Sequence, residues 1–202
     1  MRKTLLAIAA LASLAFAGAA SAGTLSGEVD FGRPQSTDYN VSYTDTIKTH
    51  IVGINYGLLA EVQPASKGPL TANLSIQAGP ALPAILGFQP AVYAEVGDHI
   101  TADVRNVTIH NVATVAQTSQ NESFWGAGVD VSHKIWGPVS ADVGYRHRQG
   151  FSNANLLRED RAAGGLDLAL DSRGTDTLGV VYYKTWGTTV SDQVGVILSH
   201  RF

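Results

Sequence analysis

Six charged side chains in the second half of the sequence alternate with apolar neighbours: Asp130, Lys134, Asp142, Arg146, Asp167 and Asp171. In a strand, positions two apart lie on the same face, so such side chains gather on one polar face. Opposite charges buried together must pair, because an isolated buried charge costs several kcal/mol. The pattern therefore predicts either a paired polar network or a charged lining that selects small solutes or ions.

The histidines offer no complete catalytic set. Asp98 and His99 are adjacent, but we expect them in a short turn, where polar residues are needed for structure alone. His133, His147 and His200 fall on the same strand face as the apolar residues around them. This favours positions at the ends of strands, where an amphipathic ring can keep its polar atoms in water. The chain also has no Cys, which removes thiolate metal sites and disulfides. We expect no catalytic residue, no metal site and no cofactor.

The segments that carry these residues alternate with a period of two. From 125 to 131 the odd positions are Trp, Ala, Val and Val, and the even positions between them are Gly, Gly and Asp. The same alternation occurs at 139–146, 70–77, 52–58 and 166–171. A period of two predicts strands. A soluble sheet with one wet face would show it as well.

The N-terminus has the pattern of an export signal. Arg2 and Lys3 precede an apolar run from Leu5 to Ala17, and the small residues Ala20-Ser21-Ala22 follow. The run is shorter than the roughly 20 residues of a membrane-spanning helix, so we expect a signal peptide over 1–22, cleaved after Ala22. Residues 23–202 then form one domain. The net charge is −3 without a basic stripe, which argues against nucleic acid as a partner.

Two features favour a membrane barrel over a soluble sheet. The polar face is rich in Gly, Ser, Thr and Asn, as a narrow lumen requires, and the apolar face carries the residues that lipid requires. The last strand ends at the final residue, and one of its faces holds Val194, Val196, Leu198, His200 and Phe202. This terminus resembles the C-terminal signature of bacterial outer-membrane β-barrels, including small porin-like barrels, although His200 stands where an aromatic residue is usual.

The resemblance implies an assembly signal formed by Val196, Leu198 and Phe202, which the barrel assembly machinery would read. It also implies outer-membrane lipid as a partner. The expected fold is all-β, a closed antiparallel transmembrane β-barrel of about ten strands. Eight or twelve strands stay open, because 39–43 could form a further short strand and 89–109 alternates poorly around Gly97-Asp98. The expected strands are 24–32, 49–62, 69–79, 89–96, 99–109, 122–134, 138–148, 162–171, 175–186 and 190–202.

An even strand number places both termini on the periplasmic side. The expected periplasmic turns are 63–68, 97–98, 135–137 and 172–174. The expected outer loops are 33–48, 80–88, 110–121, 149–161 and 187–189. The segment 80–88 is apolar where an outer loop should be polar, so we expect it to pack on the barrel rim, to lie on the outer leaflet or to bind an apolar ligand.

The last hairpin allows a register prediction. Directly facing residues in regular antiparallel strands must share a face. The turn Gly187-Thr188-Thr189 satisfies this rule and places Lys184 opposite Asp192 and Val180 opposite Val196.

The expected function is that of a non-enzymatic outer-membrane barrel, either a narrow porin-like channel for small solutes or a structural or surface protein. One alternative is a surface-binding barrel whose loops 33–48 and 149–161 contact host or envelope molecules. Another is a barrel enzyme that acts on lipid or peptide. Barrel lipid deacylases carry a His and a Ser two residues apart, and no His-x-Ser occurs here. The oligomeric state is left open.

Deleting Phe202 is expected to lower the yield of assembled barrel more than deleting a loop residue, because the terminal aromatic belongs to the assembly signal. The measurement is the heat-modifiable band of the outer-membrane fraction on gels. Equal yields from the two deletions would contradict the assignment.

Overall fold

The structure is a computed structural model that describes residues 23–33, 36–48, 53–64, 70–109, 112–152, 156–188 and 190–202. The expected signal peptide at 1–22 lies outside the described residues and stays a prediction. Among the described residues, no helix is long and apolar enough to cross a membrane.

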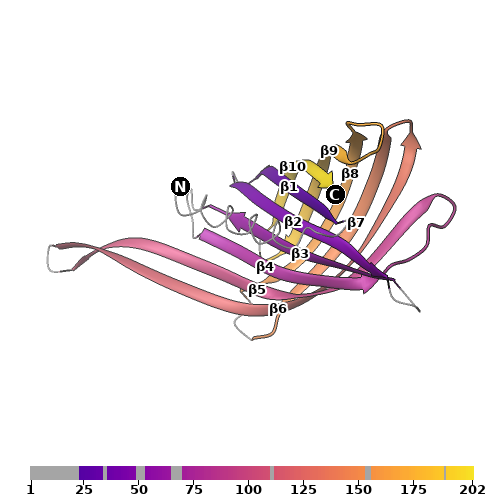
Figure 1. The fold of residues 1–202 in the computed structure, drawn as a ribbon. Coiled ribbons are helices and arrows are strands. Elements are labelled where there is room, and N and C mark those ends of the chain that lie inside the picture. Colours follow the sequence, from indigo (N-terminus) through magenta and orange to yellow (C-terminus); the bar gives the residue numbers. More distant parts are fainter. Residues whose placement is uncertain are drawn as a thin grey trace.

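Ten antiparallel strands close into a barrel (Figure 1), which confirms the expected fold class and strand number. Each strand pairs with its neighbours in sequence, and β1 pairs with β10 to close the ring. The amide of Phe202 donates to the carbonyl of Gly23 at 3.0 Å, so both ends of the described barrel lie together. The strands are β1 Thr24–Arg33, β2 Ser36–Lys48, β3 Gly53–Gln63, β4 Leu70–Pro80, β5 Phe88–Ile109, β6 Val112–Trp136, β7 Val139–Gly150, β8 Arg158–Ala169, β9 Asp176–Gly187 and β10 Ser191–Arg201.

The count of ten agrees with the prediction although two expected elements were wrong. The expected outer loop 33–48 contains β2, and the expected turn 97–98 lies inside β5, which runs without a break. Gly97 and Asp98 interrupt the apolar pattern for separate reasons. A side chain at Gly97 would collide with the backbone of β4 and the ring of Phe124, whereas Asp98 accepts a hydrogen bond from Ser123 Oγ at 2.6 Å.

Two further boundaries differ from those expected. Most of the expected loop 110–121 belongs to β6, which begins at Val112. Strand β8 begins at Arg158 and ends at Ala169 instead of spanning 162–171. The earlier start places Glu159 and Arg161 in the barrel wall.

The strand directions revise the assignment of connections to the two ends. The connections 81–87, 137–138 and 170–175 lie at the end that carries both termini. At the opposite end β7 ends and β8 begins, and β9 ends and β10 begins. The expected outer loop 80–88 is therefore at the end of the termini. Most of the expected periplasmic connection 63–68 lies outside the described residues, but β3 ends at Gln63 and β4 begins at Leu70 at the opposite end. Which end faces the periplasm stays a prediction.

The apolar connection after β4 ends in a tight hairpin turn. Ile85 and Phe88 form an isolated bridge, and the two residues between them, Leu86 and Gly87, have φ of 53° and 83°. Two positive φ values match the right-handed twist of the flanking chain. The Phe88 ring stacks on His133 at 4.4 Å between centroids, so the base of the turn packs on the rim, while Leu86 is 92% exposed.

Polar belts bound an apolar band on the outside of the barrel. Near the end opposite the termini, Lys184 Nζ lies 2.7 Å from Asp192 Oδ1, and His147 Nδ1 lies 2.8 Å from an oxygen of Asp160. Near the end of the termini, His200 Nδ1 lies 2.7 Å from Asp176 Oδ1. A tilted strand crosses a bilayer with about 9–11 residues, and the segment of β10 from Asp192 to His200 has that length.

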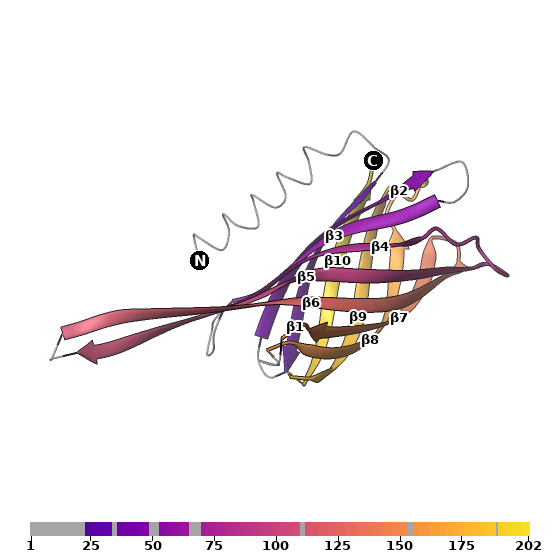
Figure 2. The same cartoon turned by 90° about the horizontal axis from the view of Figure 1, so that it is seen from below.

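Strands β5 and β6 continue far beyond the barrel. Strand β4 pairs with β5 up to Ala102, and β7 pairs with β6 up to Phe124. Beyond those points 103–109 pairs with 112–118 as a two-stranded ribbon, which Figure 2 shows projecting past the end of the barrel.

The register of the last hairpin is confirmed. Lys184 faces Asp192, Val180 faces Val196 and Leu178 faces Leu198.

Cysteines introduced at positions 180 and 196 are expected to crosslink more readily than cysteines at 180 and 195. The first pair shares the outward face at a direct pairing position, whereas Gly195 faces the lumen. The measurement is oxidative crosslinking of the folded barrel, read as a shift in gel migration. Faster crosslinking of the second pair would show a register shifted by one residue.

Candidate functional site: an ion-pair layer across the lumen

Three arginines point into the middle of the lumen. Alternation along β7 sends Tyr145 and His147 outward and Arg146 and Arg148 inward, and Arg161 on β8 joins them. Arg146 and Arg148 are 8% and 0% exposed. Guanidinium groups withdrawn from water to this degree need carboxylate partners.

Glu61 on β3 is the central acceptor. Its Oε1 accepts hydrogen bonds from Nη2 of Arg146 at 3.0 Å and from Nη1 of Arg161 at 3.2 Å, and its Oε2 accepts one from Nη1 of Arg148. Strands β3 and β8 are five places apart in either direction around the ring, so they face each other across the barrel. The bond from Arg161 to Glu61 therefore spans the lumen.

The most deeply buried pair joins Arg148 to Glu95 on β5, and both side chains are 0% exposed. The carboxylate accepts from Nε at 3.0 Å and from Nη2 at 2.5 Å, the two-pronged geometry that the planar guanidinium favours. The guanidinium carbon also lies 5.1 Å from the ring centroid of Phe124, which is within cation–π range.

Two more carboxylates complete the arrangement. Glu159 accepts from Nη2 of Arg146 at 2.7 Å, and Asp30 lies 3.4 Å from Nη2 of Arg161. Arg161 also stacks on Tyr183, at 3.6 Å from the ring centroid. We refer to these three arginines and four carboxylates as the ion-pair layer: Arg146, Arg148, Arg161, Asp30, Glu61, Glu95 and Glu159.

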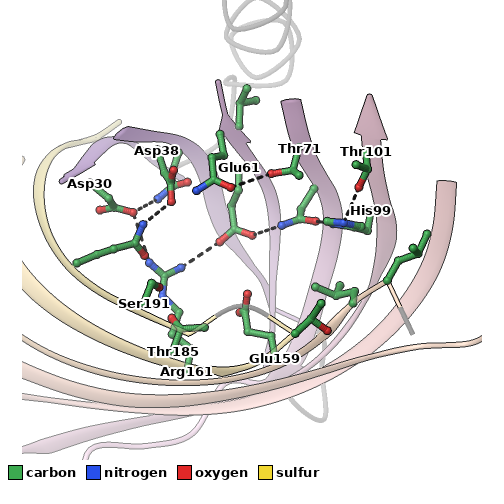
Figure 3. Close-up of a pocket in the computed structure, with 18 of the residues that line it drawn as sticks. Asp30, Asp38, Glu61, Thr71, His99, Thr101, Glu159, Arg161, Thr185 and Ser191 are labelled. Carbon is green, nitrogen blue, oxygen red and sulfur yellow. Dashed lines mark hydrogen bonds and ion pairs between the residues drawn. The ribbon is translucent and has the colours of Figure 1, made fainter. Parts of the chain in front are cut away.

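Polar cavities adjoin both sides of the ion-pair layer. On the side opposite the termini, a cavity of about 280 Å³ is bounded by Glu61, Glu159 and Arg161 (Figure 3). On the side of the termini, a cavity of about 280 Å³ shares Glu61 and Arg161 with the layer and adds Asp130 and Asp142. The layer therefore separates two polar spaces.

Three of the aspartates expected in the lumen, Asp130, Asp142 and Asp167, lie there and follow a diagonal across β6, β7 and β8. Each carboxylate sits over a glycine of the next strand: a Cβ at Gly144, Gly165 or Gly179 would collide with the carboxylate of Asp130, Asp142 or Asp167, respectively. Glycine on the facing strand thus makes room for each carboxylate. Arg146 was also expected in the lumen. It lies there and belongs to the ion-pair layer.

The other two expected lumen residues lie near the end of the termini. Lys134 is exposed and faces Ser140 on β7, next to the irregularity that ends the β6–β7 pairing, so its place in the lumen stays a prediction. Asp171 is not in the lumen, because β8 ends at Ala169 and the aspartate belongs to the turn that follows. There it accepts hydrogen bonds from Thr175 Oγ1 at 2.6 Å and from the Thr175 amide at 2.7 Å. These bonds, with those from the Asp176 and Arg173 amides, lower the pKa of Asp171 to about 2.

Of the residues assigned to the assembly signal, Val196 and Leu198 lie on the outward face of β10, and Phe202 follows the last residue of this strand. Val196, Leu198 and Phe202 are 42%, 58% and 44% exposed. Their role in assembly stays a prediction.

Sequence reasoning missed several members of the ion-pair layer. Arg148 follows Arg146 by two residues, so parity along the same strand could have found it. Glu159 and Arg161 were hidden because 149–161 was expected to be a loop. Asp30 shares the parity of lumen positions in the first expected strand, and that signal was present in the sequence.

The adjacent pair Asp98 and His99 does not act as a unit. Neighbours in a strand point to opposite faces, so Asp98 faces outward and His99 faces the lumen. His99 instead lies 2.6 Å from Asn73 Oδ1 through Nδ1.

Replacing Arg148 by Met is expected to lower the free energy of unfolding by about 3–5 kcal/mol, because Glu95 is left buried without its partner. The double variant Arg148→Met/Glu95→Met should recover most of this loss. Lys184→Met breaks a solvent-exposed pair and should leave the free energy of unfolding almost unchanged. The measurement is urea unfolding of the refolded barrel in lipid. Additive losses in the double variant would contradict a coupled buried pair.

Comparisons with known proteins support the fold. No protein-family description matches the sequence, and no curated protein is similar to it. The translocator domain of the autotransporter NalP from Neisseria meningitidis superposes with a TM-score of 0.54 at 9% identity, over 100% of this chain and 96% of that chain. The KdgM porin in complex with disordered oligogalacturonate has a TM-score of 0.48 at 8% identity, over 89% of this chain and 99% of that chain. The NanC porin has a TM-score of 0.46 at 8% identity, over 88% of this chain and 100% of that chain. The chain therefore shares the closed antiparallel β-barrel fold of the NalP translocator domain.

Proposed function

We propose that this barrel is a narrow porin-like channel of the bacterial outer membrane that passes small cations, and that the ion-pair layer limits its conductance. The observation that carries the proposal is the bond from Arg161 to Glu61 across the lumen, with polar cavities on both sides. In this role the barrel performs no chemistry. Its partners are outer-membrane lipid, the assembly machinery and the small solutes that pass.

The dimensions of the barrel support a bore that side chains control. A barrel of eight strands is filled by its own side chains, and the diameter grows only gradually with strand number. Ten strands therefore leave space that a few long side chains can close or open. Arginine and glutamate are long enough to do so, and here they meet in the middle.

The charge of the lumen supports a preference for cations. A cavity of about 310 Å³ near the end of the termini is lined by Glu28, Asp142 and Asp167, with neither Lys nor Arg among the described residues that line it. The ion-pair layer has four carboxylates against three arginines. Carboxylates that line a pore attract cations and repel anions.

A second candidate function is surface interaction, which the ribbon formed by 103–109 and 112–118 favours. The seven residues of 103–109 add about 23 Å beyond the pairing with β4, at roughly 3.3 Å per residue. A channel does not need such an extension, whereas a protein that contacts host or envelope molecules does.

The channel proposal is tested by single-channel conductance in planar bilayers. Arg161→Gln is expected to raise the conductance, because the bond across the lumen is lost, and to strengthen the cation preference. Asp167→Asn is expected to weaken the cation preference, measured as the reversal potential in a salt gradient.

The matched control is Lys184→Gln, which breaks an ion pair on the outer surface and should leave conductance unchanged. Heat-modifiable migration checks that each variant is folded. A wild-type barrel and an Arg161→Gln barrel that both fail to conduct, or an anion preference, would overturn the proposal.

A further inference from the structure

A chain of hydrogen bonds runs from Thr101 through His99 to Asn73 along the wall of the cavity opposite the termini. Thr101 Oγ1 lies 3.1 Å from His99 Nε2, and His99 Nδ1 lies 2.6 Å from Asn73 Oδ1. The other end of the Asn73 amide donates from Nδ2 to Glu61 Oε2 at 3.1 Å. Figure 3 shows this row from Glu61 to Thr101.

The direction of every proton in this row follows from Glu61. A carboxylate held by arginines is ionised and only accepts, so the NH₂ group of Asn73 must face it and the amide oxygen must face His99. An oxygen at that place requires a proton on Nδ1 of His99. The neutral imidazole then presents the lone pair of Nε2 to Thr101, and the hydroxyl of Thr101 donates to it.

We propose that Thr101, His99 and Asn73 form a nucleophile, general base and positioning residue that give the lumen an acyl-transfer activity on small esters. The arrangement meets the geometric requirement for an activated hydroxyl: a base within hydrogen-bond reach, held in one tautomer by a third group. It goes beyond the channel function, which does not use these three residues. The sequence contains no His-x-Ser, but His99 and Thr101 have the same spacing with threonine in place of serine.

The three residues line a cavity that is large enough for a small ester. Its volume is about 280 Å³, at the lower limit of ordinary ligand pockets. His99 is 8% exposed and Thr101 is half-buried, so the base is shielded from bulk water and the hydroxyl is open to the cavity. Short acyl esters are the substrate class that fits.

The reaction balances without a further reactant except water. The Thr101 oxygen bonds to the ester carbonyl carbon while its proton passes to Nε2 of His99. The carbon–alkoxide bond then breaks, and the proton on Nε2 goes to the departing alcohol, which leaves an acyl ester on Thr101. Water attacks this ester, gives a proton to Nε2, and releases the carboxylic acid as Thr101 regains its proton.

The backbone around Thr101 makes covalent capture a better readout than turnover. Thr101 is paired with Thr71 on one side and Gln120 on the other. The backbone of β5 at this point therefore takes part in strand pairing and does not form an oxyanion hole. Oxyanion donors contribute about 10²–10³ to kcat in enzymes that have them. We therefore expect slow hydrolysis and a stable covalent adduct with a phosphorus reagent.

The test is reaction of the full refolded barrel with diisopropyl fluorophosphate, which forms a phosphorus–oxygen bond at the hydroxyl and releases fluoride. Peptide mass spectrometry should place the adduct on Thr101. Thr101→Val should abolish the adduct, and Thr101→Ser should form it faster. His99→Gln should slow labelling by about 10²-fold or more, as expected for loss of a general base.

Two controls separate this activity from a structural role. Asn73→Leu should slow labelling and shift its pH dependence, because His99 loses the group that fixes its tautomer. Ser26→Ala removes a lumen hydroxyl that bonds only to Ser199 in the described structure and should leave labelling unchanged. Folding of each variant is read from heat-modifiable migration. Absence of an adduct on both Thr101 and its Ser replacement, or labelling that His99→Gln leaves unchanged, would overturn the proposal even if the channel conducts.

Discussion

The lumen of this barrel is governed by one requirement, that charges withdrawn from water must be paired. Glu61 pairs with three arginines at once. The same arginines pair with Glu95, Glu159 and Asp30. The partners come from β1, β3, β5, β7 and β8, and apart from the β7–β8 pair of Arg146 with Glu159 they join strands that are not adjacent in the ring. The shape of the cavities on either side follows from where this layer lies.

The same layer links the two proposals made for the lumen. Glu61 orients the Asn73 amide through Nδ2, and that amide determines which nitrogen of His99 carries the proton. The carboxylate at the centre of the proposed constriction therefore also directs the hydroxyl of Thr101. A change at Glu61 would alter both properties, whereas changes at Arg161 or Thr101 separate them.

The alternation of apolar and polar residues made the strands, the outward faces and the last hairpin predictable, and the composition of the two faces together with the C-terminal resemblance indicated a barrel. Pairing of Lys184 with Asp192 followed from two conditions. Parity excludes a shift by one residue, which would place lipid-facing side chains in the lumen, and the tightest turn that fits the flanking patterns fixes the rest. Parity failed where strands depart from simple patterns. Strand β2 was expected to be a loop because its lumen positions are strongly polar. Strand β5 was expected to be two strands because Gly97 and Asp98 interrupt the apolar pattern. These two residues contact Phe124 and Ser123, which are distant in sequence. Contacts across the lumen, such as Arg161 with Glu61, are set by closure of the ring and have no local signal.

The bond from Arg161 to Glu61 also has a mechanical meaning. A closed tube of strands is stiff along its length, and its softest distortion flattens the circular cross-section into an ellipse. Backbone ladders resist this weakly, because each hydrogen bond only needs to hinge. A tie between opposite walls acts as a diameter brace and opposes widening along its own axis. The barrel is therefore stiffened in the one direction in which β3 and β8 could separate, and lateral pressure from the bilayer would deform it unequally.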